Sequence, residues 1–370
     1  MHHAEESLRE HLTSTLLGLL KIPSVTGDEG AIADHFERWA LAHMPRLEVQ
    51  RFGNSLVLGE PADDRPTLAL VGHLDTVPPH PSDAGPRREG DKIYGRGASD
   101  MKSGLAVAQT LLDTLPLASL PFSLVFVLYD REEGPFTENG LKTLLEEVRA
   151  LSAVDLAVLL EPTDNAIEVG CLGSLHAKLV VRGRAAHSAR PWQGENAIHK
   201  AAPLMSRVAA IEPRPVLVSG LSFRESMSLT LAQAGHARNV IPDRVELNLN
   251  YRFAPADDPE AACRAAVERV RTLTAEADLD IVDLAPPGRV PSDNAFLDEL
   301  SRLVGSERRA KEAWTDVARF GLWGVDAVNF GPGTSAQAHQ ANEWASLEAM
   351  IHAYEILKDF LTAPLPIREP

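Results

Sequence analysis

Cysteine is scarce in this 370-residue chain, which contains only Cys171 and Cys263. Two cysteines cannot build a disulfide framework or a cysteine-based zinc site within one chain. Long apolar runs are absent as well, since no stretch approaches the roughly 20 residues that a membrane-spanning helix needs. The segment from Met1 to Lys21 mixes charged residues with its leucines, unlike the uninterrupted apolar segment of a signal peptide. We therefore expect a cytoplasmic protein without a membrane span.

Positive charge is also in deficit. Lysine and arginine number 36 against 52 aspartates and glutamates, which gives a formal net charge of -16. Such a chain repels phosphate backbones, so we expect no nucleic-acid partner. The hydrophobic fraction of 44% and the charged fraction of 24% are typical of globular proteins, and 370 residues exceed what one hydrophobic core usually serves. The composition predicts a globular protein of two domains.

The first half of the chain alternates helices with short apolar strands, which is typical of an α/β fold with a largely parallel sheet. Helices are expected at residues 8–20, 103–115 and 141–148, and strands at residues 67–71, 122–129 and 155–160. Polar residues follow each of these strands.

The pattern changes near residue 174. Strand, helix, strand, strand, helix and strand follow one another at residues 175–181, 197–210, 226–232, 245–253, 259–275 and 279–284. This order is the βαββαβ module with a ferredoxin-like topology. After the linker Ala285-Pro286-Pro287-Gly288, the α/β pattern resumes with a helix at residues 295–304 and a strand at residues 327–330. We predict a catalytic domain of residues 1–173 and 286–370 and an inserted lid or dimerisation domain of residues 174–285.

His73 and Asp75 stand out in the motif Gly72-His73-Leu74-Asp75-Thr76-Val77-Pro78, which directly follows the first of these strands. Alternation along an extended chain places the two side chains on one face. A ligating histidine usually gives its other N–H to an oxygen acceptor, so the pair suits a metal ligand and the carboxylate that orients it. The alternative is a strand end that happens to carry two polar residues.

Asp100 lies in the glycine-rich stretch Gly95-Arg96-Gly97-Ala98-Ser99-Asp100-Met101-Lys102-Ser103-Gly104, just before an expected helix. Two interpretations are open. Aspartate is a preferred N-cap residue, so Asp100 could simply cap the helix. A carboxylate in this place could also bridge two metal ions. A phosphate-binding loop is disfavoured, because the GxxxxGK[ST] spacing is missing.

Glu132 and Glu133 follow another strand, in Asp130-Arg131-Glu132-Glu133-Gly134. Outside a metal site, one of two adjacent carboxylates would be solvated or paired with Arg131. In a metal site, one carboxylate can bind the ion while its neighbour takes a proton from the water that the metal acidifies.

Glu161, in Glu161-Pro162-Thr163, and His339, which follows the turn with Gly331 and Gly333, are weaker signals one by one. A Glu-Pro pair is more often a strand-ending turn, and a single histidine is more often a surface residue. Their positions add weight, because ligands in open α/β sheets gather at the carboxyl ends of the strands.

The combined candidates offer only nitrogen and oxygen ligands, which suits zinc, cobalt or manganese. The five are His73, Asp100, Glu133, Glu161 and His339. Five donors are one too many for a simple single site. If Asp100 is shared, each ion has one histidine, one glutamate and the bridge, with an open position for water. This is the pattern of two-metal hydrolases, whose ions lie about 3.5–4 Å apart.

These residues resemble the zinc-dependent aminoacylase and carboxypeptidase family, which includes acetylornithine deacetylases, succinyl-diaminopimelate desuccinylases and related dipeptidases. The resemblance covers essentially the whole chain. It rests on five features in the family's order: residues 72–78, residues 95–104, Glu132-Glu133, Glu161-Pro162-Thr163 and the inserted βαββαβ module. It implies a zinc-peptidase-like catalytic domain of the α/β class with an inserted lid.

The resemblance also implies roles for the metal ligands. His73 and Glu161 would bind one zinc ion, and Glu133 and His339 the other. Asp100 would bridge the two ions.

Further roles are implied for residues outside this ligand set. Asp75 would orient His73, and Glu132 would be the general base that takes a proton from water and passes it to the leaving amine. His187 would stabilise the negatively charged oxygen of the reacting carbonyl, a residue that the partner subunit supplies in dimeric family members. Asn239 and Arg252 would contact the carboxylate end of the substrate, where a bidentate guanidinium suits the geometry. The turn at Gly331 and Gly333 is also assigned to substrate binding.

Within the family, residues 313–320 and 329–333 look most like the actinobacterial-type succinyl-diaminopimelate desuccinylases. This implies hydrolysis of N-succinyl-LL-2,6-diaminopimelate to succinate and LL-2,6-diaminopimelate by a two-zinc centre, with cobalt or manganese as substitutes. Positions 130, 131, 172 and 190 depart from other desuccinylases. Acetylornithine and dipeptides are therefore alternative substrates. A metal-free binding protein on this fold is the alternative to an enzyme. The inserted module also predicts a homodimer, since an exposed strand edge or helix face could pair with a copy of itself.

Overall fold

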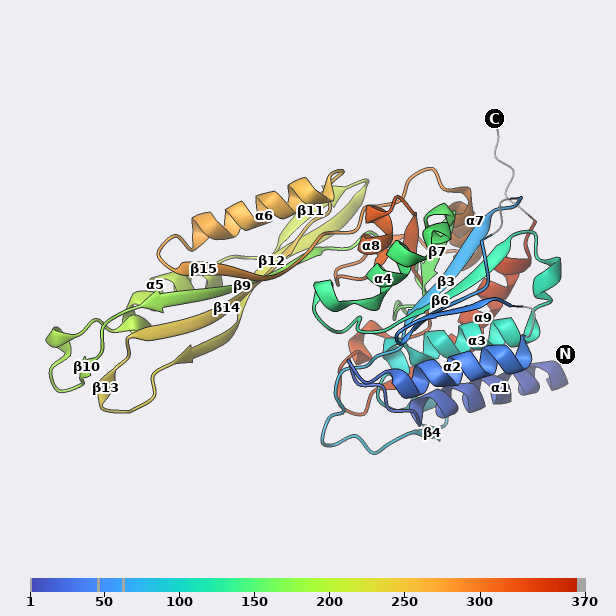
Figure 1. The fold of residues 1–370 in the computed structure, drawn as a ribbon, viewed down its shortest axis with the longest axis horizontal. Coiled ribbons are helices and arrows are strands. Elements are labelled where there is room, and N and C mark those ends of the chain that lie inside the picture. Colours follow the sequence, from blue (N-terminus) through green and yellow to red (C-terminus); the bar gives the residue numbers. More distant parts are fainter. Residues whose placement is uncertain (1, 45–46, 62–63, 365–370) are drawn as a thin grey trace. The chain divides into compact units, whose positions relative to one another are not determined.

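The computed structural model describes residues 2–44, 47–61 and 64–364. The chain divides into two compact units (Figure 1). Unit 1 consists of residues 1–169, 291–309 and 319–370, and unit 2 consists of residues 170–290 and 310–318. Along the chain, unit 2 therefore interrupts unit 1.

An eight-stranded sheet forms the centre of unit 1, with the strand order β1-β2-β6-β3-β7-β17-β8-β16. Its strands are β1 (Val49–Phe52), β2 (Ser55–Leu58), β3 (Thr67–His73), β6 (Ser123–Tyr129), β7 (Leu156–Leu159), β8 (Glu168–Val169), β16 (Arg309–Ala310) and β17 (Ala327–Asn329). Neighbours run parallel from β6 through β3 and β7 to β17, whereas β1 with β2, β2 with β6, and β17 with β8 pair antiparallel. The expected α/β class is confirmed, and the sheet is mixed, with its parallel part at the centre.

Every residue of β3 and β6 is buried, as is usual for parallel strands covered on both faces. The covering helices of unit 1 are α1 (His2–Leu20), α2 (Gly30–His43), α3 (Ser103–Thr114), α4 (Gly140–Glu147), α7 (Ala295–Val304) and α9 (Leu347–Thr362). α3 packs against α1, α9 and β3, while α4 packs against β2 and β6 (Figure 1). α8 (Val317–Leu322) spans the point where the chain passes from unit 2 back to unit 1.

A small three-stranded sheet in unit 1 joins distant parts of the sequence. Its strands are β4 (Arg87–Glu89), β5 (Lys92–Tyr94) and β18 (Trp344–Ser346). β18 pairs antiparallel with β5, with Trp344 opposite Tyr94. The segment that follows His339 is therefore held beside the segment that leads to Asp100.

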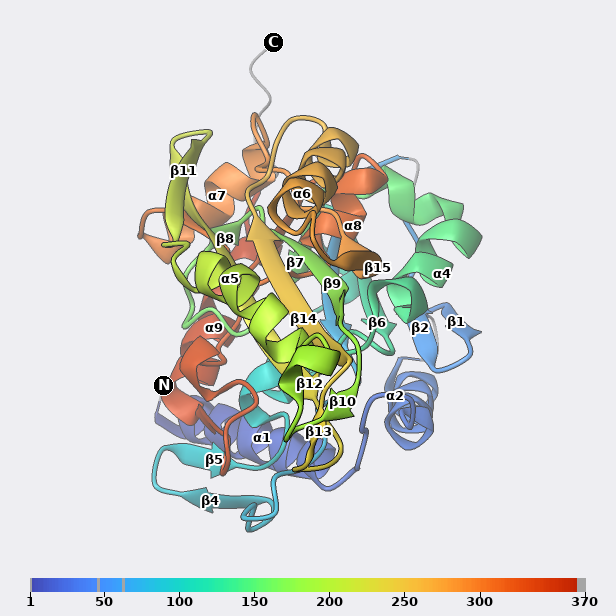
Figure 2. The same cartoon turned by 90° about the vertical axis from the view of Figure 1, so that its left-hand side faces the viewer.

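Unit 2 contains a five-stranded antiparallel sheet in the order β11-β12-β14-β9-β15. Its strands are β9 (Gly173–Arg182), β11 (Arg214–Val218), β12 (Leu221–Ala234), β14 (Arg244–Phe253) and β15 (Asp278–Ala285), and its helices are α5 (Ala197–Ala209) and α6 (Pro259–Leu273). Without β11, the remaining elements follow the expected βαββαβ order. A separate pair of short strands, β10 (Ala186–His187) and β13 (Val240–Ile241), completes the unit (Figure 2).

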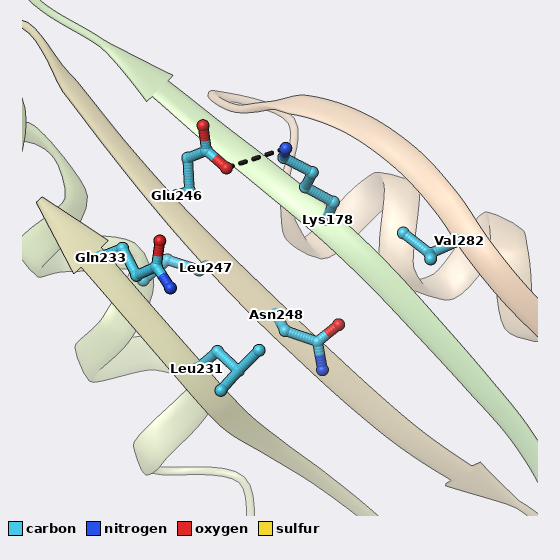
Figure 3. Close-up of a pocket in the computed structure, with 7 residues that line it drawn as sticks. All are labelled: Lys178, Leu231, Gln233, Glu246, Leu247, Asn248 and Val282. Atoms are coloured by element: carbon cyan, nitrogen blue, oxygen red, sulfur yellow. Dashed lines mark ion pairs between the residues drawn. The ribbon is translucent and has the colours of Figure 1, made fainter. Parts of the chain in front are cut away.

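The two faces of the unit 2 sheet differ in polarity. On β14, alternate residues such as Val245 and Leu249 are buried in the core with residues of α5 and α6, whereas the residues between them are only partly buried. The face away from the helices carries a hollow of about 220 Å³ (Figure 3). Leu231 and Val282 line this hollow, and each is 62% exposed. An ion pair of 2.8 Å between Lys178 and Glu246 crosses it.

Within residues 2–44, 47–61 and 64–364, none of the helices combines the length and the apolar character that a passage through a lipid bilayer requires.

Candidate metal centre and active site

Three of the sequence motifs lie at the carboxyl ends of adjacent parallel strands in the unit 1 sheet. In the parallel register, His73 at the end of β3 lies opposite Tyr129 at the end of β6, just before the Glu132-Glu133 pair. On the other side of β3, the Leu160 backbone N–H donates to the carbonyl of Val71 at 2.9 Å. Glu161 is the next residue and is buried, with 5% of its surface exposed. These residues thus all follow the carboxyl ends of adjacent parallel strands.

The Asp100 carboxylate lies between two imidazoles. Its Oδ1 is 3.2 Å from His73 Nε2, and its Oδ2 is 3.7 Å from His339 Nε2. His339 Nε2 also lies 2.8 Å from Glu133 Oε1. His73, Asp100 and Glu133 each offer a ligand atom, and these three atoms lie within 4.8 Å of one another. The structure therefore brings together residues as distant in the sequence as His73 and His339.

Asp100 is not the N-cap of a helix, so the capping interpretation is wrong. α3 begins at Ser103, its N-cap residue is Lys102, and the Lys102 side chain makes no capping hydrogen bond. Asp100 lies one turn earlier, in the π-helical turn Ala98–Lys102, with φ -122° and ψ 92°. Asp100 and the next residue, Met101, both have non-helical backbone angles, so the chain bends here before α3 begins.

Asp75 joins the His73 strand end to the loop that carries the two glutamates. Its Oδ1 accepts the backbone N–H of Glu132 at 2.9 Å, and its Oδ2 accepts that of Glu133 at 3.0 Å. The hydroxyl of Thr26 donates to Oδ2 at 2.9 Å. His73 Nδ1 lies 3.0 Å from the backbone carbonyl of Asp75 and 3.5 Å from its carboxylate. The nearest acceptor for the His73 ring is therefore the Asp75 main chain.

Protonation in this cluster reflects its crowded carboxylates. Burial alone would lower the pKa of His73, but its hydrogen bonds with Asp100 and Asp75 and the nearby charge of Glu132 raise that pKa well above its ordinary value. The hydrogen bond to Glu133 raises the pKa of His339. A proton is thus attracted to the place where a bound cation would meet the same nitrogens. Imidazole nitrogens and carboxylate oxygens fit a zinc, cobalt or manganese ion.

Unit 2 holds three other candidate residues. His187 in β10 lies opposite Val240 in β13, and the Ser188 backbone N–H donates to the carbonyl of Asn239 at 2.9 Å, so His187 and Asn239 are neighbours. His187 is exposed, and its Nδ1 accepts the Ala189 backbone N–H at 3.0 Å. The neutral ring therefore carries its proton on Nε2.

Arg252, the third of these residues, lies in β14 and is partly buried. Burial lowers its pKa. Its Nε donates to Asn250 Oδ1 at 3.2 Å, which fixes the direction of the guanidinium group.

Gly331 is held tightly by its neighbours. Its backbone N–H donates to Thr163 Oγ1 at 3.0 Å, and its carbonyl accepts the Thr163 hydroxyl and the backbone N–H of Asn165. A Cβ atom at Gly331 would lie 2.5 Å from the carbonyl oxygen of Glu161. At Gly333, a Cβ atom would collide with the carbonyl oxygen of Ser99. Both glycines are required for the close approach of this turn to the metal-site loops.

The curated relatives extend over nearly the whole chain. The succinyl-diaminopimelate desuccinylase of Corynebacterium glutamicum is 39% identical over 350 residues, which cover 93% of this chain and 94% of that protein. A putative succinyl-diaminopimelate desuccinylase of Mycobacterium tuberculosis is 38% identical over 345 residues, with 93% and 96% covered. The sequence pattern of peptidase family M20/M25/M40 matches residues 69–363. The chain belongs to this family.

Structural comparison agrees with membership in the M20/M25/M40 family. The aminopeptidase PepT of Bacillus cereus superposes with a TM-score of 0.74 at 19% identity, covering 96% of this chain and 98% of that chain. At this identity, the likeness concerns the fold. The resemblance read from the motifs is confirmed, and the chain is a metal-dependent amide hydrolase.

Proposed function

We propose that this chain hydrolyses the amide bond of N-succinyl-LL-2,6-diaminopimelate and releases succinate and LL-2,6-diaminopimelate. The observation that carries the proposal is the position of Asp100, whose two carboxylate oxygens face two different imidazoles, those of His73 and His339. A carboxylate between two nitrogen ligands suits a bridge between two cations. The choice of substrate is supported by the two relatives with 39% and 38% identity, whose names both describe this desuccinylation.

The proposal includes two zinc ions, with cobalt or manganese as substitutes. His73 and Glu161 would hold one ion, Glu133 and His339 the other, and Asp100 both. This division leaves each ion with three protein ligands, the number that keeps a position open in catalytic zinc sites. When bound, the ions would supply a water of lowered pKa and positive charge at the substrate carbonyl oxygen.

Glu132 is the residue we assign to proton transfer. Asp75 holds its backbone N–H at 2.9 Å, so the glutamate starts from a fixed point beside His73. Glu132 takes one proton from the attacking water while the water oxygen bonds to the amide carbon. It then gives that proton to the amine nitrogen as the carbon–nitrogen bond breaks. Water is the only co-reactant, and the products are a carboxylic acid and an amine.

Three residues of unit 2 are assigned to the substrate. His187 would donate its Nε2–H to the carbonyl oxygen as negative charge develops there. Arg252 and Asn239 would bind a carboxylate of the amino-acid part, with Arg252 aimed by Asn250. Gly331 and Gly333 would border the same substrate.

A homodimer through unit 2 is also part of the proposal. β11 pairs with β12 only from Leu221 to Glu225, so among the described residues no strand flanks the outer edge of β12 from Ser226 to Ala234. Leu231 on this stretch is 62% exposed. An unpaired edge with exposed apolar residues suits antiparallel pairing with the same edge of a second copy.

Cytoplasmic residence, expected from the N-terminal composition, belongs to this proposal as well.

A substrate panel tests the proposed reaction directly. The zinc-loaded chain is assayed on N-succinyl-LL-2,6-diaminopimelate, N-acetylornithine and simple dipeptides. We expect kcat/KM to favour the succinyl substrate by at least about 100-fold, because a site that pairs buried polar groups with one substrate rejects analogues that leave them unpaired. A higher kcat/KM for acetylornithine or a dipeptide would overturn the substrate assignment. Purified chain that holds no metal, and gains none when zinc or cobalt is added, would overturn the metal chemistry.

The assignment of Glu132 has its own test. Glu132→Gln should keep both metal ions and lower kcat by about 100-fold or more, since it removes a general base. Glu138→Gln is the control, because Glu138 lies in the same loop with its side chain 57% exposed. Wild-type turnover in Glu132→Gln would show that another group moves the proton.

A further inference from the structure

Glu343 is a buried acid that follows His339 by four residues and that no motif singles out. Only 2% of its surface is exposed. Its Oε1 accepts the backbone N–H groups of Ser99 at 2.8 Å and Asp100 at 2.9 Å, and its Oε2 accepts that of Gly97 at 2.9 Å. Arg96 Nη1 lies 3.3 Å from the same Oε2. One carboxylate therefore binds three backbone N–H groups of the loop that carries Asp100.

The carboxylate of Glu343 holds the main chain at Asp100 itself. The hydrogen bond to the Asp100 N–H fixes the main chain directly beside the side chain that faces His73 and His339. Both oxygens of the Glu343 carboxyl group are held by backbone N–H donors of one loop, so this link is stiff. The segment that holds Glu343 also holds His339, which faces the other Asp100 oxygen.

We infer that Glu343 is a positioning residue that sets the distance between the Asp100 carboxylate and His339, and through it the affinity of the site for its metal ions. The inference rests on the proposed two-metal site. Glu343 contacts neither substrate nor metal in this scheme, and it acts through the backbone of Asp100. Residues that orient metal ligands typically change metal affinity by about 10–100-fold when they are mutated.

Other hydrogen bonds hold the fold of this region, so a loss of the Glu343 carboxylate can change the position of Asp100 without unfolding the loop. β18 pairs with β5, and the Glu343 backbone carbonyl accepts the Gly95 N–H at 3.0 Å. Ser99 Oγ bonds both the N–H and the carbonyl of Thr334 at 2.7 and 2.9 Å. None of these bonds uses the Glu343 carboxylate. Loss of that carboxylate should therefore loosen Asp100 while the loop stays attached.

Glu343→Gln is the sharpest variant. The amide keeps the shape of the side chain, but its NH₂ group must face either the Gly97 N–H and Arg96 or the N–H groups of Ser99 and Asp100. Either way, donors oppose donors. Glu348→Gln is the matched control, because it makes the same substitution five positions later, where the side chain is 60% exposed and binds Arg9.

Zinc affinity is measured on the full chain by competition with a chromophoric chelator, together with circular dichroism of the metal-free protein. Wild type and Glu348→Gln should bind two zinc ions with equal affinity. We expect Glu343→Gln to keep the wild-type spectrum, to bind at least one ion about tenfold or more weakly, and to lose kcat with little change of KM. The readout of zinc affinity does not depend on turnover.

Two outcomes separate the inference from the proposed function. Wild-type zinc affinity in folded Glu343→Gln would overturn the positioning role while leaving the two-metal site intact. Absence of zinc binding by the wild type would overturn the site itself. Glu343→Asp serves where Glu343→Gln does not fold, because it keeps the carboxyl group and shortens the side chain by one carbon. Wild-type zinc affinity in Glu343→Asp, where Glu343→Gln does not fold, also overturns the inference, whereas weaker binding supports it.

Discussion

Asp75 and Glu132 are joined by a hydrogen bond of 2.9 Å from the Glu132 backbone N–H to Asp75 Oδ1. The other oxygen of Asp75 accepts the N–H of Glu133 at 3.0 Å. Asp75 is 1% exposed and stands two residues after His73. A single buried carboxylate therefore ties the end of β3 to the loop that follows β6. The proposed general base and a proposed metal ligand are both positioned by the same residue.

Asp75→Asn should disturb the position of the loop with Glu132 and Glu133 more than the position of the His73 ring. The asparagine has one acceptor oxygen for two N–H donors, and its NH₂ group would face the second donor. We expect kcat to fall by about 10–100-fold, the usual cost of losing a group that orients a metal site. The measurement is kcat with zinc content on the same sample. Asp28→Asn, at an exposed position, is the control, and an unchanged kcat in Asp75→Asn would contradict this role.

His339→Asn tests the second metal position. His339 has a positive φ of 62°, a backbone conformation that asparagine tolerates better than most residues. The variant therefore removes the ligand nitrogen while the turn is kept. We expect zinc content to fall from two ions to one per chain and kcat to fall by about 100-fold or more, because the second ion then loses one of its three protein ligands. Elemental analysis gives the stoichiometry, His236→Asn is the exposed control, and two retained ions would remove His339 from the ligand set.

Gly331→Ala tests whether the turn after β17 must lie against the Glu161 segment. The added Cβ would stand 2.5 Å from the carbonyl oxygens of Leu160 and Glu161, and these are backbone atoms that cannot turn aside. We expect a loss of about 1–3 kcal/mol in the free energy of unfolding, the usual cost of overpacking. Urea unfolding measures it. Gly18→Ala is the control, since an added Cβ there would meet no atom within 4 Å beyond its neighbours and the backbone of its own helix, and an equal stability of both variants would contradict the close packing.

The strand ends were the most predictable part of this protein. Continuous apolar runs marked β3, β6 and β7, and the polar residues after them had to meet where parallel strands end. The sequence pattern was less informative where one residue type fits two roles, such as helix capping and metal binding. Asp100 has the sequence position of an N-cap, but the helix begins only at Ser103, after a bend at Asp100 and Met101, and the Asp100 carboxylate faces His73.

Long-range contacts made other residues invisible to sequence reasoning. Glu343 lies 243 positions from Asp100, and a single glutamate before Trp344 has no periodicity that would suggest burial. β11 and α2 were not predicted either. The mostly exposed residues of β11 give a weak pattern, and its place is set by pairing with β12. α2 carries Ile32, Phe36 and Trp39 at helical spacing, so its sequence did hold a signal that the predicted helices leave out.

Glu225 offers a test of stability in unit 2 that is independent of the metal site. It is 8% exposed, and its oxygens accept the backbone N–H of Ala254 at 3.0 Å and the side chains of Arg214 at 2.8 Å and Arg269 at 3.2 Å. Burial alone would raise the pKa of Glu225, but these partners lower it below the ordinary value of 4.5. The folded protein therefore releases this proton more readily than the unfolded chain does.

The sign of the pH dependence follows from that difference. With a lowered pKa in the folded state, Glu225 contributes stability above about pH 4.5, and the contribution is lost as the pH falls through the lowered pKa. Glu225→Gln should reduce the free energy of unfolding at pH 7 by about 1–3 kcal/mol, because buried partners lose a charged acceptor. As the pH falls through the lowered pKa, the wild-type carboxyl itself takes up a proton, and the difference between variant and wild type should shrink. Urea unfolding at pH 7 and at a series of pH values below 4.5 measures it, with the exposed Glu212→Gln as control, and a deficit that stays constant over the whole series would show that the Glu225 charge does not stabilise the fold.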